Sequence, residues 1–242
     1  MIQQLKNGIK KIVYSIIPPP YIPASYSQAG EDAVLRFLFR DMGITHIKYL
    51  DLGTNTPNYG NNTFLFYKHG STGVCVEADP SLIQEIKAIR PDDKIIHAGV
   101  AVSSEKEADF YIFNSSGINT FNKEEAEYRS SLGNYKIVQV VKVPLVNINE
   151  LIKDNFETYP DLMSIDIEGM DLEVLQSLDY EKYPIPVICV ETCLYSENHI
   201  HPKDPAITAF LIKKGYEVYA DTYINTIFIN RDWFYNKVTI KI

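Results

Sequence analysis

The stretch YLDLGTNTPNYGNNTFLFYKHGSTGVCVEADP, from Tyr49 to Pro80, holds two short apolar runs that each end in a carboxylate. The first run ends at Asp51, just before Gly53, and the second ends at Glu77. Both runs have the length of buried strands, and turn-forming residues lie between them. Because ligands of open α/β sheets bind outside the carboxyl ends of the strands, this spacing predicts a ligand site where the two runs end.

Strand-like and helix-like segments alternate along the rest of the chain, which is typical of a doubly wound, mostly parallel sheet. The last two strand-like runs, YEVYA and NTIFIN, are joined by a linker too short for a crossover helix, so we expect them to be antiparallel. We therefore predict one α/β domain over residues 21–242, with a mostly parallel seven-stranded sheet and an antiparallel C-terminal strand pair. The polar stretch from Asn114 to Asn134 is predicted to be a mobile loop beside the site.

The composition is that of a globular protein rather than a disordered one. Of the 242 residues, 45% are hydrophobic and 22% are charged, and the net charge is -8. An acidic chain with scattered lysines is a poor binder of phosphate backbones, so we expect no nucleic-acid partner. The three cysteines show neither a disulfide framework nor a zinc spacing, which indicates a reducing, cytoplasmic location.

The N-terminal segment MIQQLKNGIKKIVYSIIPPP predicts an amphipathic helix over residues 1–20 that ends at three prolines. It is too short and too charged to span a bilayer. Two interpretations stay open: the helix packs on the domain, or it contacts a membrane surface or a partner such as a second copy of the chain. We expect the cofactor site to fold without it, because the strand signals begin well after Pro20.

The two strand-end acids and the glycine between them favour one cofactor. Glu77 can accept hydrogen bonds from both hydroxyls of a ribose, as in adenosine-type cofactors. A dinucleotide would require G-x-G-x-x-G, whereas this loop has a lone Gly53, and Asp51 would repel a pyrophosphate. The pattern therefore predicts S-adenosylmethionine, which carries a cationic amino-acid tail and no phosphate. Loop-capping acids on a non-binding sheet, or a nicotinamide-dependent oxidoreductase, are the alternatives.

Several stretches resemble the FkbM-type family of S-adenosylmethionine-dependent methyltransferases. They are SQAGEDAVLRFLF (27–39), the stretch quoted first, VNINELI, LMSIDIEGMDLEVLQSLD (162–179) and ICVE ending at Glu191. The resemblance implies a Rossmann-like, class I methyltransferase fold and methyl transfer to a hydroxyl of a sugar, glycan or related product. Ala78 departs from the family, which often has proline there. The cofactor contacts that the resemblance implies are Gln28, Glu31, Asp51, Gly53, Asn55, Glu77, Gly99 and Val100.

A sugar hydroxyl is a weak acid, so methyl transfer to it needs a base or a metal. Asp166 and Glu168 follow the fourth strand of the predicted order, Glu191 ends the fifth, and His201 follows in SENHIHP. Because adjacent strand ends meet at one edge, we expect Asp166, Glu168 and Glu191 to converge, as ligands of Mg²⁺, Mn²⁺ or Ca²⁺. The predicted catalytic residues are Asp166, Glu168 and His201.

Two further possibilities concern this predicted reaction centre. Without a metal, one of the acids would carry a raised pKa and act as the base itself. Asp171 is also interpreted as a helix-start acid that the helix dipole stabilises. A non-catalytic domain that only binds S-adenosylmethionine or a partner is the alternative function.

Overall fold

The computed structural model describes residues 25–102, 105–167, 169–193 and 202–239. The predicted N-terminal helix, Glu168 and His201 lie outside these described residues, so the predictions about them remain predictions. Among the helices that the model describes, none combines the length and the apolar character needed to cross a membrane.

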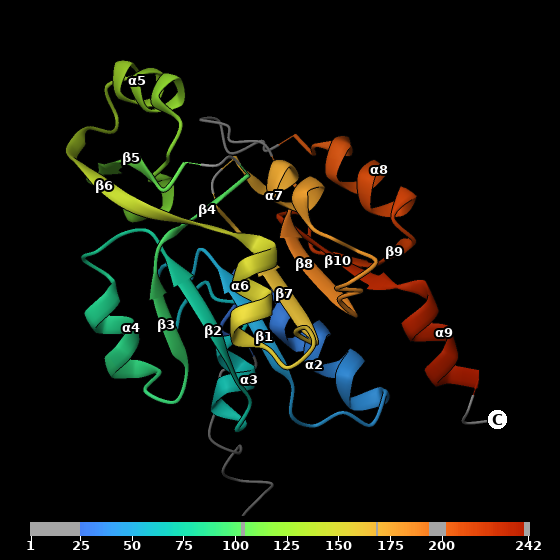
Figure 1. Cartoon of the computed structure of the whole chain (residues 1–242). Coiled ribbons are helices and arrows are strands. Elements are labelled where there is room, and N and C mark those ends of the chain that lie inside the picture. The colour runs from blue at the N-terminus through green and yellow to red at the C-terminus, as the bar shows by residue number, and fades with distance from the viewer. Residues whose placement is uncertain (1–24, 103–104, 168, 194–201, 240–242) are drawn as a thin grey trace, which may run out of the picture.

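A seven-stranded sheet forms the centre of the molecule (Figure 1). All its strands are parallel except β10, which runs antiparallel to both of its neighbours, so the predicted sheet with its antiparallel C-terminal pair is confirmed. In sheet order the strands are β3 (Lys94–His97), β2 (Thr72–Glu77), β1 (Lys48–Leu52), β7 (Leu162–Ile165), β8 (Val187–Glu191), β10 (Asn225–Asn230) and β9 (Tyr216–Asp221).

Helices cover both faces of this sheet, as the nearly continuous burial of its parallel strands requires. A helix at the C-terminal end follows the last strand, where the sequence predicted none. The helices are α2 (Glu31–Asp41), α3 (Phe64–Lys68), α4 (Ile83–Ile89), α5 (Lys123–Ser131), α6 (Ile148–Asn155), α7 (Asp171–Ser177), α8 (Pro205–Lys213) and α9 (Arg231–Thr239).

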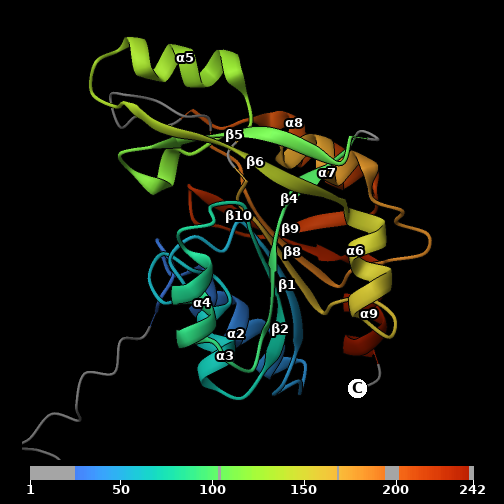
Figure 2. The same ribbon diagram turned by 60° about the vertical axis from the view of Figure 1, so that its left-hand side comes forward.

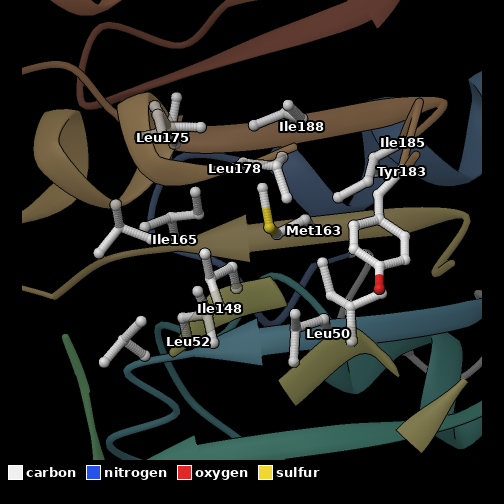
Figure 3. Packing of buried hydrophobic residues seen from close by; sticks show 14 of the residues in the cluster. Leu50, Leu52, Ile148, Met163, Ile165, Leu175, Leu178, Tyr183, Ile185 and Ile188 are labelled. Atoms are coloured by element: carbon white, nitrogen blue, oxygen red, sulfur yellow. The ribbon is translucent and has the colours of Figure 1, made fainter. Parts of the chain in front are cut away.

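The two faces of β1 belong to different parts of the core, because successive side chains of a strand point to opposite faces. Leu50 and Leu52 pack with Met163 and Ile165 of β7 and with side chains of α6 and α7 (Figure 3). Tyr49 packs on the opposite face with side chains of α2 and α4. Both faces are therefore dry, and the polar ends of the strands are left for a ligand.

A second, three-stranded sheet extends from the domain. It contains β4 (Gly99–Ala101), β6 (Ile137–Asn147) and β5 (Glu107–Phe113), with β6 in the middle. Figure 2 shows β5, β6 and α5 at the same end of the molecule, beyond the central strands. The polar stretch predicted as a loop is therefore largely structured: it contains a 3₁₀ helix, η1 (Ser116–Ile118), and α5. Asn122 caps α5 by accepting a hydrogen bond from the backbone N–H of Glu125.

Capping side chains explain where two other helices begin. The sequence offers Asn147 and Asn149 as N-caps of α6, and the Asn147 side chain caps it by accepting a hydrogen bond from Asn149 N. The sequence DPSLIQEIKAIR also predicts a helix capped by Asp79, but α4 begins later, at Ile83. The Asp79 carboxylate instead accepts hydrogen bonds from the backbone N–H and the hydroxyl of Ser81, which stabilises the turn before the helix.

Candidate active site

A cavity lies where β1, β2 and β7 end. Residues of the segment from β5 to β6 (107–147), which we call the insertion, complete its wall. Its position agrees with the rule that ligands of parallel sheets bind at the carboxyl ends of the strands. We call it the first cavity. The residues predicted to contact the cofactor that line it are Gln28, Gly53, Asn55, Glu77, Gly99 and Val100.

Glu77 is held in a defined orientation at the end of β2. Its Oε2 accepts a hydrogen bond of 2.7 Å from Asn55 N, and its Oε1 accepts one of 2.7 Å from Asp79 N. Burial raises the pKa of Glu77, and the two N–H groups oppose that rise. A carboxylate has about four acceptor positions, so Glu77 retains capacity for a hydroxyl donor in the cavity.

The backbone conformation and the close packing at position 53 both require glycine there, whether or not a ligand is bound. Its φ is +80°, a left-handed conformation that favours glycine, as its place in the loop predicted. A Cβ at this position would collide with the backbone carbonyl oxygen of Asp166. The chain segments that follow β1 and β7 therefore come into direct contact here, which brings Asp166 to the wall of the cavity.

Asn55 presents an unsatisfied group at this site. Its φ of 47° is also left-handed, a conformation in which asparagine is enriched among residues other than glycine. Its Oδ1 is buried and has no hydrogen-bond partner in the described structure. Such an atom is costly to leave unpaired, so a ligand that donates a hydrogen bond to it would be stabilised.

One side of the first cavity is apolar. Val100, Leu82, Phe110 and Phe121 line it, and the rings of Phe110 and Phe121 lie 4.6 Å apart between centroids. Gly99 leaves room for this arrangement, since a Cβ there would collide with the Phe121 ring. An apolar, aromatic wall beside a carboxylate that can accept hydrogen bonds suits a flat heterocyclic base.

Asp51, predicted to contact the cofactor, lines neither the first cavity nor the second cavity that adjoins it and is described below. Its Oδ2 lies 3.3 Å from Nη1 of the fully buried Arg90 and accepts hydrogen bonds from Thr63 Oγ1 (2.8 Å) and Asn61 Nδ2 (3.0 Å). Arg90 also pairs with Asp93 at 2.8 Å. The ion pair therefore connects Asp51 to the end of α4, and the two hydrogen bonds connect it to the loop before α3. A direct contact with the cofactor remains a prediction.

Glu31, also predicted to contact the cofactor, does not line the first cavity and instead connects two parts of the fold. Its carboxylate accepts hydrogen bonds from Thr222 Oγ1 (2.6 Å), Asn225 Nδ2 (3.2 Å) and Ala29 N (2.9 Å). Burial by itself would raise the pKa of Glu31, but the hydrogen bonds from Thr222 and Ala29 hold it below its ordinary value. The side chain fastens the start of α2 to the β9–β10 hairpin, whereas its neighbour Gln28 reaches the cavity.

A second cavity adjoins the first, and Gln28, Gly117 and Asp166 line both. Asp166 follows β7, and Glu191 ends the neighbouring β8, where Ile165 pairs with Val190. The side chains of Asp166 and Glu191, two of the three acids expected to converge, share a hydrogen bond. Two carboxyl groups can form that bond only if one of them holds a proton.

The surroundings of this acid pair favour the protonated form. Burial first, and then the negative charges of neighbours such as Asp171 and Asp51, raise the pKa of Asp166 to about 7. A hydrogen bond with Glu191 opposes part of that rise. Asp166 is therefore poised to exchange a proton near neutral pH.

Asp171 organises the segment between β7 and α7. Its carboxylate accepts hydrogen bonds from Ile167 N at 3.2 Å and from Gly169 N at 3.3 Å. Burial raises its pKa to about 6. Asp171 is the first residue of α7, in agreement with its interpretation as a helix-start acid. Its side chain also lines the second cavity.

Among the described residues, no group of three or more His, Cys, Asp or Glu side chains is arranged to hold a metal ion. Asp166 and Glu191 are the two described members of the predicted ligand set, and Glu168 lies outside the description. The predicted metal site therefore stays a prediction.

Sequence reasoning missed Arg90 and the cavity residues of the insertion, among them Phe110, Asn119 and Phe121. Arg90 stands in the segment AIRPDD with its partner Asp93, but nothing in that segment indicates that the two charged residues are buried. Phe110 before the polar stretch 114–134 and Phe121 within it gave only a weak signal.

Comparisons with known proteins were made on sequence and on structure. A search of curated proteins found no match. Solved structures similar to the chain include a putative O-methyltransferase from Klebsiella pneumoniae (TM-score 0.42, 11% identity, 95% of this chain and 99% of that one). Another is an O-methyltransferase from Bacillus cereus in complex with SAH (TM-score 0.43, 12% identity, 91% and 96%). A third is a putative RNA methyltransferase from Pyrococcus horikoshii (TM-score 0.43, 12% identity, 90% and 95%).

These TM-scores lie below 0.5, so the family assignment rests on a family model. The model of the methyltransferase FkbM domain matches residues 51–218, which is more than half of the chain. The match includes Asp51, Glu77, Asp166 and Glu191, the strand-end acids described above. This chain belongs to the FkbM-type methyltransferase family.

Proposed function

We propose that the protein is an S-adenosylmethionine-dependent O-methyltransferase that acts on a hydroxyl of a sugar, a glycan or a related natural product. One observation carries the proposal. Asp166 lines both cavities, shares a hydrogen bond with Glu191, and has a pKa raised to about 7. A proton acceptor at the junction of two cavities is what methyl transfer to a weakly acidic hydroxyl requires.

The first cavity fits the cofactor by the chemistry of its side chains. Glu77 would accept hydrogen bonds from ribose hydroxyls, Asn55 Oδ1 would accept one from a donor of the ligand, and the Phe110 side would hold the adenine. S-adenosylmethionine supplies a methyl group already activated on a sulfonium. The acidic surroundings of Asp166 suit that positive charge.

In the proposed reaction, the acceptor hydroxyl oxygen attacks the methyl carbon, and the carbon–sulfur bond breaks with its electron pair going to sulfur. The Asp166–Glu191 pair takes the hydroxyl proton. Gln28, which lines both cavities, would help to position the acceptor oxygen in line with the breaking bond. His201, predicted as a base that passes the proton to solvent, keeps that proposed role.

Metal assistance is a second route for the same step. Asp166 and Glu191 would supply two oxygen ligands to Mg²⁺, Mn²⁺ or Ca²⁺, and Glu168 would supply a third. A bound cation would lower the pKa of the acceptor hydroxyl, whereas the carboxylate base of the first route accepts its proton without changing that pKa. Turnover after exhaustive chelation, with each metal then added back, separates the two routes.

The test combines binding and turnover. Calorimetry should detect S-adenosylhomocysteine and not NAD(H) or NADP(H). Incubation with isotopically labelled S-adenosylmethionine and a panel of glycans and glycosides should yield a product heavier by one methyl group. Asp166→Asn should bind S-adenosylhomocysteine and lose the transfer. Binding without transfer to any member of the panel would favour a non-catalytic binding domain, and absence of binding would overturn the proposal.

A further inference from the structure

The second cavity has a wall built from several separate elements. It lies between the segment after β7, the end of β8, the beginning of α8, and α5 of the insertion. It meets the first cavity at Asp166, Gln28 and Gly117. An acceptor that receives a methyl group from the first cavity would have to approach through this adjoining space.

The described side chains that line this second cavity are strongly biased in charge. One is basic, Arg129 of α5, and its Nη2 lies 2.6 Å from Glu125 Oε1 while its Nη1 donates to Ile118 O. The acidic residues in the wall are Glu125, Asp166, Asp171, Glu173, Glu191 and Asp204.

The wall keeps a net negative charge after the nearby cation and the shared proton are counted. Arg129 balances Glu125, and one shared proton can neutralise either Asp166 or Glu191. Asp171, Glu173 and Asp204 still remain, together with the other member of the Asp166–Glu191 pair. Lys203 lies near this wall, but its Nζ is 2.7 Å from Asp221 Oδ1, so that carboxylate already offsets its charge.

Resting on the proposed function, we infer that the second cavity is the acceptor site and that it selects hydroxyl compounds without negative charge near the reacting hydroxyl. Neutral sugars and amino sugars share that property. Uronic acids, sugar phosphates and nucleotide-sugars bound by their phosphates do not. A concave surface lined by one sign of charge concentrates ligands of the opposite sign and repels those of the same sign.

A native cysteine can be used to measure the electrostatic potential in the second cavity. Cys193 lines the second cavity and is partly exposed, whereas Cys75 and Cys189 are fully buried. Methanethiosulfonate reagents of similar size exist with a cationic trimethylammonium or an anionic sulfonate group. In each case the Cys193 thiolate attacks the reagent's sulfenyl sulfur, a disulfide forms, and methanesulfinate leaves. The ratio of the two rates, divided by the same ratio for 2-mercaptoethanol, reports the potential at the thiol.

We expect the cationic reagent to be favoured by about tenfold at low salt, and the preference to shrink toward unity at 1 M salt, where the Debye length is about 3 Å. Cys193→Ser should abolish the labelling. Glu173→Gln and Asp204→Asn should each reduce the preference, and asparagine also preserves the N-cap that Asp204 supplies to α8. Glu181→Gln, an exposed acid that lines neither cavity, is the matched control and should leave the preference unchanged.

Labelled protein then tests the location of the acceptor. A bulky uncharged adduct on Cys193 should block methyl transfer to the glycan panel and leave the affinity for S-adenosylhomocysteine unchanged. Equal normalised rates for the two charged reagents would overturn the charge selection, and undiminished transfer by the blocked enzyme would overturn the acceptor site. Loss of the proposed function has a different signature: unmodified protein that fails to bind S-adenosylhomocysteine while the thiol still shows its charge preference.

Discussion

Two buried aspartates at neighbouring strand ends have opposite kinds of partner. Asp51 of β1 faces the Arg90 guanidinium, and hydrogen bonds from Asn61 and Thr63 complete its shell. Asp166, just after β7, shares a hydrogen bond with a second acid, Glu191. The β1 and β7 strands are paired in parallel, so the two aspartates stand at the same edge of the sheet.

The difference shows that the partner, rather than the strand end, decides what a carboxylate does. The buried Arg90 offsets the charge of the first aspartate, which connects the loop before α3 to the end of α4. Burial, and then the charges of Asp171 and Asp51, raise the pKa of the second aspartate and leave it able to take a proton, while the hydrogen bond with Glu191 opposes part of that rise. We therefore expect substitutions at the two positions to have separable effects, on folding in one case and on turnover in the other.

The largest effect is expected for Asp166→Asn. Loss of the proton acceptor should lower kcat by about 10²–10⁴-fold, the usual contribution of a positioned general base. The affinity for S-adenosylhomocysteine should change little, and so should the urea midpoint at acidic pH, where Asp166 is protonated, because asparagine preserves the shape and can still hydrogen bond to Glu191. Steady-state kinetics and calorimetry on the same preparation check both parts. Full activity would show that Asp166 is not the base.

Arg90→Met should show the opposite pattern, with its main effect on stability rather than on turnover. It leaves the carboxylates of Asp51 and Asp93 buried without their cation, which typically costs about 3–5 kcal/mol of unfolding free energy. Urea denaturation measures the loss, and Arg36→Met, at an exposed position of α2, is the control. A stability near that of the control would mean that the buried network does not fasten the site as its geometry indicates.

Glu77→Gln tests a third strand-end acid, which belongs to neither class because its carboxylate is held by backbone N–H groups and faces a ligand cavity. Loss of a charged acceptor for ribose hydroxyls should cost about 1.5–3 kcal/mol, or roughly 10–150-fold in affinity for S-adenosylhomocysteine. Glu150→Gln, on the exposed side of α6, is the matched control. An unchanged dissociation constant would remove Glu77 from the cofactor site.

The smallest expected effect, taken per pH unit, is on the pH dependence of stability. The pKa of Asp166 is raised in the folded state, so its contribution is complete below the unfolded pKa of 3.8 and is lost as the pH rises toward 7. The unfolding free energy should therefore fall over this window, by at most about 1.4 kcal/mol per pH unit. Asp171 acts in the same sense up to about pH 6, so the informative quantity is the difference between the wild type and Asp166→Asn. A parallel pH profile for the two proteins would contradict the raised pKa.

The strand pattern predicted much of the candidate site. Apolar runs that end in Glu77, Asp166 and Glu191 identified the edge where the cavities lie, because an alternation of strands and helices implies a parallel sheet whose carboxyl ends share one edge. Gly53 was identified from its place after a strand, and its left-handed backbone explains why glycine stands there. The Asp166–Glu191 contact followed from strand order alone.

Other site features depended on contacts that no local pattern contains. The stretch from Asn114 to Asn134 was expected to be a loop, yet its 3₁₀ helix and nearby aromatic side chains line the first cavity, and its α5 helix lines the second. Their low apolar content gives little helical periodicity, so packing against β5 and β6 decides their structure more than the local sequence does.

The sequence by itself determined the order and type of the central strands, their direction, and which acids stand at their ends. Alternation, turn residues and run length are local properties, readable from neighbours in the chain. Only the tertiary structure decided which partner each buried acid would have. Asp51 lies beside Arg90, 39 positions away in the sequence, and Glu31 accepts a hydrogen bond from Thr222, 191 positions away. The pKa of a buried carboxyl depends on the charges brought beside it in space, and folding alone brings them there.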